Sequence, residues 1–138
     1  MNPAAAVANI TFRALPDGEA GILETRVTTP PRGDVSNSVA IRVMGHVLAL
    51  TAPIQRIEAV VHGHVLATGV PDTATLDVAG RFPGLPWAAQ CGFTLLVDSL
   101  ILHRSFKFTL RVICSDGTVV NVASVSGERR PLESRYAP

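Results

Sequence analysis

The segment from Phe106 to Cys114 alternates between apolar and polar side chains, and this two-residue period constrains the fold more than any other feature of the sequence. Apolar side chains at every second position share one face of an extended strand, whereas an amphipathic helix needs spacings of three and four. The segment therefore predicts a half-buried antiparallel strand with one face in a core and the other in solvent.

The same alternation predicts further strands over 39–49 and 93–97, and a weaker one over 22–29 that ends before two consecutive prolines. The segments 57–61 and 65–67 are separated by a break at Gly63, which indicates a hairpin. Phe93 follows Gly92 and shares its predicted inward face with two other apolar residues. We expect Phe93 to be the main anchor between the two sheets.

The final hairpin is expected around Ser115-Asp116-Gly117. A two-residue turn at Asp116-Gly117 would place the inward residue Val112 opposite a polar asparagine. A three-residue loop with Gly117 in the left-handed conformation instead places Val112 opposite Val120, and Leu110 opposite Val122. We predict the three-residue loop, because it keeps every apolar residue on the core face.

Residues 71–89 contain too many prolines to form one regular element. We predict a single helical turn over Val78–Arg81, capped by Asp77, with Phe82 folding back toward the core. Elsewhere almost no helix is expected.

The sequence predicts an all-β fold: an Ig-like antiparallel β-sandwich of about seven strands over residues 21–127. Residues 1–20 are expected to be a weakly structured tail, and residues 128–138 a polar tail or linker. Trp87 precedes both Cys91 and Cys114 instead of lying between them, so the antibody-type disulfide is not expected. Opposite sheets would hold the two cysteines too far apart to bond, and we predict two buried, reduced thiols; if the two strands were neighbours in one sheet, a disulfide would be feasible.

Charge argues against polyanionic partners. Twelve Lys and Arg residues nearly balance eleven Asp and Glu residues, so a net charge of +1 provides no long-range field to steer nucleic acid or anionic lipid. No apolar run is long enough for a transmembrane segment, and the first residues lack the basic region of an export signal. We expect a cytoplasmic protein, or one held at the inner membrane through a partner or a longer chain.

An ordered set of short motifs spans about Val27 to Gly127. It runs through Gly45-His46-Val47-Leu48, Ile54 to Gly63, Asp77-Val78, Phe82-Pro83, Gly92-Phe93 and Asp116-Gly117. This order and spacing resemble the Ig-like modules of bacterial glycosyltransferases and other surface-polysaccharide pathway proteins. His46 stands where those modules usually have Trp, and Thr75-Leu76 where they have Arg-Pro. The resemblance implies a non-catalytic accessory role with a protein partner or an adjacent domain, and no cofactor.

Two other functions depend on particular side chains. Trp87, with Arg81 and His46, could form a glycan-binding site, since sugars stack on aromatic faces beside polar groups; the competing interpretation is that Trp87 packs over the end of the sandwich. His62 and His64 flank Gly63 and could bind a metal ion with His46 or His103 as a third ligand, as a small metal-dependent enzyme would require. Solvated turn histidines are the more common explanation of such a pair, and no serine-hydrolase or phosphate-binding motif is present.

Overall fold

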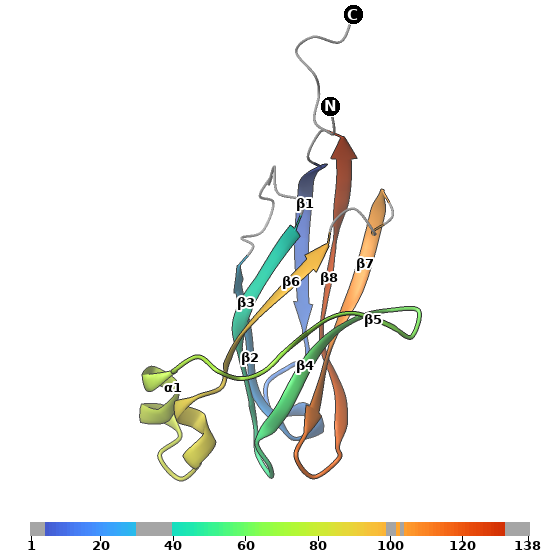
Figure 1. Ribbon diagram of the computed structural model, residues 1–138. Helices are drawn as coiled ribbons and strands as arrows, with labels where there is room; N and C mark the ends of the chain where they lie inside the picture. The colour runs from blue at the N-terminus through green and yellow to red at the C-terminus, as the bar shows by residue number, and fades with distance from the viewer. Residues whose placement is uncertain (1–4, 30–39, 99–101, 103, 132–138) are drawn as a thin grey trace, which may run out of the picture.

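A computed structural model of the chain describes residues 5–29, 40–98, 102 and 104–131. In these residues eight strands form two antiparallel sheets that pack face to face (Figure 1). The five-stranded sheet has the order β1 (Ala5–Ala14), β8 (Val119–Pro131), β7 (Ser105–Cys114), β4 (Ile54–Val61), β5 (His64–Gly69). The three-stranded sheet has the order β2 (Ile22–Thr29), β3 (Ala40–Ala49), β6 (Gly92–Asp98).

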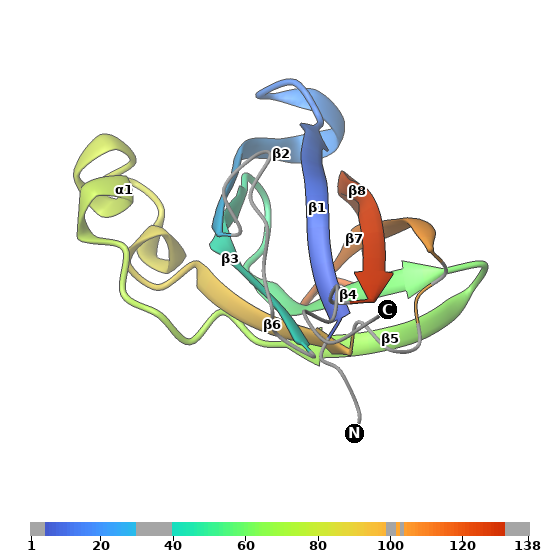
Figure 2. The same ribbon diagram turned by 90° about the horizontal axis from the view of Figure 1, so that it is seen from above.

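The all-β sandwich class is thus confirmed. The strands β2, β3 and β6 share one sheet, while β4, β7 and β8 are neighbours in the other, as strands A-B-E and C-F-G are in Ig-type sandwiches. Figure 2 shows β3 on one side and β7 with β8 on the other, with the helical segment outside the three-stranded sheet. No helix in the described part of the chain is long and apolar enough to cross a membrane.

The core fills the space between the sheets with the inward residues that the alternation predicted. Phe93 on β6 and Phe108 on β7 are the largest of the fully buried side chains, at 1% and 0% exposure. Phe108 also stacks on Phe106, with ring centroids 6.1 Å apart. The expected burial of Phe93 and the inward face of its strand are confirmed.

Two hairpins show why glycine occupies their turns. His62 and Gly63 both have positive φ, 49° and 80°, as a two-residue type I′ turn requires. Gly117 has a φ of 90° in the last hairpin, where Val112 pairs with Val120 as predicted. The expected Leu110–Val122 pair is wrong: Leu110 lies opposite Ala123, because a register shift after Leu110 inserts one extra residue into β8.

The expectation of a weakly structured tail over residues 1–20 is wrong for the described part of that segment. Residues 5–14 form β1, which pairs antiparallel with β8 from Ala5 opposite Pro131 to Ala14 opposite Ala123. Ile10 is fully buried in the core. The sandwich therefore extends beyond the predicted limits of 21 and 127, with β8 ending at Pro131. The expected tail beyond residue 131 lies outside the described residues.

The one predicted helical turn is present as α1 (Leu76–Arg81). Asp77 does not cap it: Thr75 occupies the cap position and Asp77 lies in the first turn. Phe82 packs against a separate cluster outside the sandwich, not against the main core. Two short 3-10 turns, η1 (Glu19–Gly21) and η2 (Pro86–Ala89), were not predicted.

Candidate functional site

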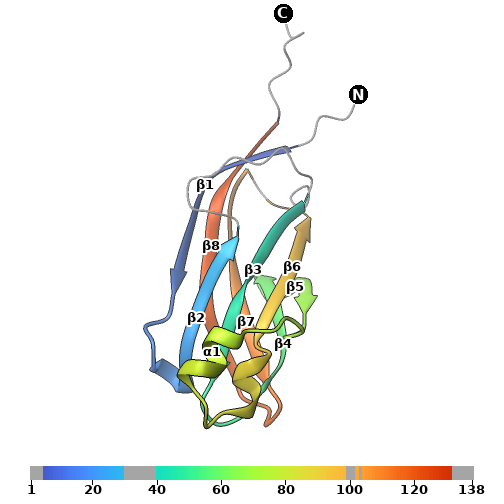
Figure 3. The same ribbon diagram turned by 90° about the vertical axis from the view of Figure 1, so that its left-hand side faces the viewer.

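A second hydrophobic cluster lies on the outer face of the three-stranded sheet. After β5 the chain passes Thr73, which pairs with Gly92 at the start of β6, and then forms α1 and η2 before it enters β6. Figure 3 shows this segment across the lower ends of the three strands, leaving their upper halves free of any labelled helix. We call the side chains involved the outer cluster: Leu48, Val78, Ala88 and Cys91, all buried, surrounded by Leu23, Phe82, Leu85 and Trp87.

The Glu24 carboxylate is buried beside the outer cluster and is bound by three basic side chains. Arg81 donates two hydrogen bonds to it, of 2.6 Å from Nη1 and 3.0 Å from Nη2. His46 Nε2 lies 3.1 Å and Arg26 Nε 2.9 Å from Oε1. The Arg81 hydrogen bonds, against the opposing effect of burial, lower the pKa of Glu24 from 4.5 to about 2, with help from His46 and Arg26. The carboxylate is therefore ionised at neutral pH.

A bulge in β2 places Glu24 in this position. The register passes from Ile22 opposite Ala49 directly to Glu24 opposite Leu48, so Leu23 has no partner of its own in the ladder. Ile22 points into the main core, whereas Leu23 packs in the outer cluster and Glu24 reaches His46 on the same outer face. The bulge thus supplies two successive outward side chains, one apolar and one charged.

Two of the three residues predicted as ligand-binding, Arg81 and His46, are brought together by Glu24. Arg81 also lies over the ring of Phe82, 5.7 Å from its centroid, and Nη2 is 3.9 Å from Asp77. These contacts fasten α1 to β2 and β3. Sequence reasoning missed Glu24 itself, because nothing in its neighbourhood marks it as the common partner.

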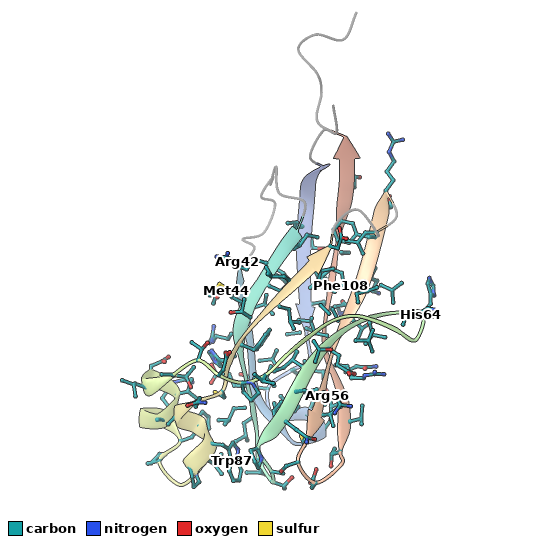
Figure 4. All side chains as sticks on the ribbon, viewed as in Figure 1. Arg42, Met44, Arg56, His64, Trp87 and Phe108 are labelled. Atoms are coloured by element: carbon teal, nitrogen blue, oxygen red, sulfur yellow. The ribbon has the colours of Figure 1, made fainter. Side chains whose placement is uncertain are left out.

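Trp87, the third predicted ligand-binding residue, lies at the lower end of the sandwich (Figure 4) and is not among the side chains that hydrogen-bond to Glu24. Its indole Nε1 donates a 2.8 Å hydrogen bond to the carbonyl oxygen of Ala49 at the end of β3. Its ring is partly buried in the outer cluster. Packing over the end of the sandwich, the alternative stated for this residue, is the arrangement found.

Thr75 closes the segment from the other side. Its hydroxyl donates to the Ala88 carbonyl at 2.7 Å, and accepts from the Cys91 backbone N–H at 3.2 Å. The side chain thereby ties the start of α1 to the end of η2. Thr75 stands where the resembled modules have Arg, and its role was not predicted.

The two cysteines are free and buried, as predicted. Cys91 precedes β6 in one sheet and Cys114 ends β7 in the other. Burial raises the pKa of both thiols, which disfavours the reactive thiolate.

No described helix or strand covers the upper half of the same outer face. We call Arg42, Met44, Thr94 and Leu96 the outer strip; the ladder pairs Arg42 with Leu96 and Met44 with Thr94. Leu96 is 58% exposed. Arg42 and Met44 point away from the sandwich in Figure 4. Among the described residues Arg42 makes no ion pair and is exposed, while Met44 is half-buried.

The histidine metal site, the less favoured interpretation of His62 and His64, is not assembled in the described residues. His62 lies in the type I′ turn and His64 begins β5, both exposed, and Figure 4 shows His64 at the outer end of this hairpin. His46 is on the other sheet and contacts Glu24. Within residues 5–29, 40–98, 102 and 104–131, no three His, Cys, Asp or Glu side chains are grouped to hold a metal ion. His103, the other suggested third ligand, lies outside these residues.

A second buried carboxylate, Glu58, lies on the five-stranded sheet. Arg111 Nη2 contacts it at 2.6 Å from the neighbouring strand β7, and Arg56 Nε at 3.1 Å from β4 itself. The Arg111 hydrogen bonds lower its pKa. The ladder places Glu58 directly opposite Arg111, so this is a cross-strand pair that adds to the pairing of β4 with β7.

Comparisons with protein-family models, curated proteins and solved structures gave no match to this chain.

Proposed function

We propose that the chain is a non-catalytic interaction module that presents the outer face of its three-stranded sheet to a protein partner or an adjacent domain. The module belongs, in this proposal, to a bacterial protein of polysaccharide synthesis, in line with the motif order described above. The observation that carries the proposal is the pairing of Arg81 and His46 with Glu24. Side chains suited to a ligand are used to hold α1 in place.

The contacts of Glu24 favour an interaction surface over a binding pocket. The basic side chains of Arg26, His46 and Arg81 all converge on the carboxylate of Glu24. The indole N–H of Trp87 is likewise bonded to backbone. These contacts hold α1 and η2 in place beside the outer strip, and a rigid surface loses little conformational entropy when a partner binds.

The outer strip has the composition of a contact surface. Met and Arg are enriched in protein interfaces, and the exposed Leu96 opposite Arg42 provides apolar area that a partner can bury. Met44, Arg42 and Leu96 are adjacent across β3 and β6. The partner is expected to cover the strip and rest against α1.

Site-specific photocrosslinking in the native host tests this proposal. A photoreactive amino acid replaces Leu96, at 58% exposure, and in a matched control it replaces Val119, at 55% exposure near the tip of the β7–β8 hairpin. We expect one discrete polypeptide adduct from position 96 and none from position 119. A second substitution, Met44→Asp, should abolish the adduct.

Three results would contradict the proposal: no adduct at position 96, equal adducts at both positions, or an adduct that survives Met44→Asp. A glycan array with the purified chain addresses the competing function. Glycan binding that is lost in Trp87→Phe would favour a sugar-binding module.

A further inference from the structure

An apolar cavity opens where β4 and β7 separate. The two strands pair from Ile54 opposite Cys114 as far as Val60 opposite Thr109. Beyond that point β4 turns at His62-Gly63 into β5, while β7 extends to Ser105 paired with β8 alone in the described ladders. The cavity in this fork measures about 680 Å³, within the range of about 300–1,000 Å³ that ligand sites occupy. We call it the fork cavity.

The walls of the fork cavity are apolar and its rim is basic. Its apolar lining consists of Val60, Val61, Leu66, Leu102 and Phe106. His62, His64 and Lys107 supply the nitrogen-bearing side chains of the lining, and no Asp or Glu is among the described residues that line it. An occupant therefore gains by burying hydrocarbon and by carrying negative charge at its outer end.

A polar cleft adjoins the fork cavity on the outer face of the five-stranded sheet. It measures about 330 Å³, and its polar lining includes Arg13, Lys107, Thr109, Asn121 and Ser124. Lys107 and Thr109 line both spaces, so the apolar cavity and the polar cleft meet at these two side chains.

The charge at this junction is not neutralised within the described part of the molecule. Neither Lys107 nor Arg13 forms an ion pair there. Glu128, which lies opposite Ser105, has an interaction of its own and lines neither space. The cleft thus offers two cations, an amide and two hydroxyl groups to a headgroup.

We propose that the fork cavity and the polar cleft together bind a single-chain amphiphile with an anionic headgroup. The hydrocarbon chain lies in the fork cavity, against Leu66 and Phe106. The headgroup lies over Lys107 and extends toward Arg13 and Asn121. This site is on the opposite sheet from the outer strip, so it is independent of the interaction surface proposed above.

Dodecyl phosphate below its micelle concentration is the probe, and Lys107 provides the readout because it is the only lysine of the chain. Binding should slow acetylation of Lys107, measured by mass spectrometry, while acetylation of the chain's N-terminal amine serves as the internal reference. Titration calorimetry gives the affinity. Dodecyl maltoside has the same tail without charge, and inorganic phosphate has the charge without the tail.

We expect 1:1 binding of dodecyl phosphate, about tenfold weaker binding in Lys107→Gln, and unchanged binding in the control Arg42→Gln on the other sheet. Val60→Trp, which fills the fork cavity, should abolish binding, and Lys107→Gln keeps the test decisive if that variant does not fold. The proposal is overturned if dodecyl phosphate fails to bind, or if Lys107→Gln binds it as the parent does. Equal affinity for dodecyl maltoside would refute the anionic headgroup, and equal protection by inorganic phosphate would refute the hydrocarbon site.

Discussion

The guanidinium of Arg81 and the carboxylate of Glu24 are joined by two hydrogen bonds although 57 residues separate them in sequence. The pair links a short helix to an edge strand. Its two partners differ in exposure, because the Arg81 side chain is 48% exposed and that of Glu24 only 4%. Loss of the Glu24 carboxylate would therefore leave three basic side chains clustered around one site without the negative charge that they share.

Removing the Glu24 charge should destabilise the fold. The lowered pKa, from 4.5 to about 2, corresponds to a stabilising contribution that is complete above pH 4.5 and lost as the pH falls toward 2. After allowance for the exposure of Arg81 and Arg26, we expect Glu24→Gln to cost about 2 kcal/mol near neutral pH.

Urea unfolding as a function of pH measures this effect. The difference in unfolding free energy between the parent and Glu24→Gln should be constant from neutral pH to about 4.5 and should shrink below it. Glu58 also has a lowered pKa, but it is present in both proteins, so its contribution cancels when the unfolding free energy of the variant is subtracted from that of the parent. A difference that stays constant down to about pH 2 would show that Glu24 does not titrate as described.

Phe93→Ala should cost about 3 to 5 kcal/mol, because it removes a ring that is 1% exposed between the sheets. Leu96→Ala is the matched control on the same strand, where the side chain is 58% exposed, and it should change stability by about 0.5 kcal/mol or less. Thermal or urea unfolding compares the two. Similar melting of both variants would mean that the inward face of β6 is assigned incorrectly.

Two substitutions separate the hydrogen bond of Trp87 from its packing as contributions to stability. Trp87→Phe should lose the bond to the Ala49 carbonyl and cost about 1 kcal/mol, whereas Trp87→Ala should also lose the ring and cost about 2 to 4 kcal/mol. Urea unfolding followed by circular dichroism suits this test, since Trp87 is the only tryptophan. Variants as stable as the parent would instead favour a surface-exposed aromatic platform.

Glycine is required at Gly45 and dispensable at Gly80. A Cβ at Gly45 would collide with the backbone of Arg26 and Val27 on the neighbouring strand, so Gly45→Ala should cost several kcal/mol or prevent folding. A Cβ at Gly80 meets no atom within 4 Å, and Gly80→Ala in α1 should stabilise by about 0.5 to 1 kcal/mol. Expression level and melting temperature distinguish them; tolerance of Ala at position 45 would contradict the close approach of β2 and β3.

The two cysteine thiols should react readily with a thiol reagent only after the chain is unfolded. Both thiols are buried and form no disulfide, and burial raises their pKa values. A disulfide-exchange reagent should count two thiols in denaturant and react much more slowly with the native chain. A count of zero in denaturant would reveal a disulfide.

The strands were predictable wherever an alternating segment kept its phase. From Phe106 to Val112 each residue faces the side that the pattern indicates. In β1, by contrast, the register shifts between Ala8 and Thr11, and the remaining alternation is too short to stand out among alanines. Bulges interrupt the two-residue period without a distinctive sequence, and this also explains why the pairing of Leu110 was misjudged.

The site was less predictable than the fold for a related reason. Arg81 and His46 were singled out correctly as polar residues of note, but their common partner depends on a bulge in β2 and on the path of a 22-residue segment between β5 and β6. No local pattern encodes a contact between residues so distant in sequence. The same holds for the fork cavity, which exists because β4 stops pairing with β7 at Val60.

The geometry of the β1–β8 ladder bears on how the chain responds to mechanical load. Ala5 lies opposite Pro131, so tension applied through the flanking chain acts at one end of this antiparallel ladder. Its hydrogen bonds, each contributing about 1 kcal/mol, then break one pair after another instead of shearing together. We expect β1 to peel away first under tension, which exposes an edge of β8 and removes Ile10 from the main core. A fusion at both ends thus gives an element that yields at low force, whereas a fusion at a single end leaves the ladder unloaded.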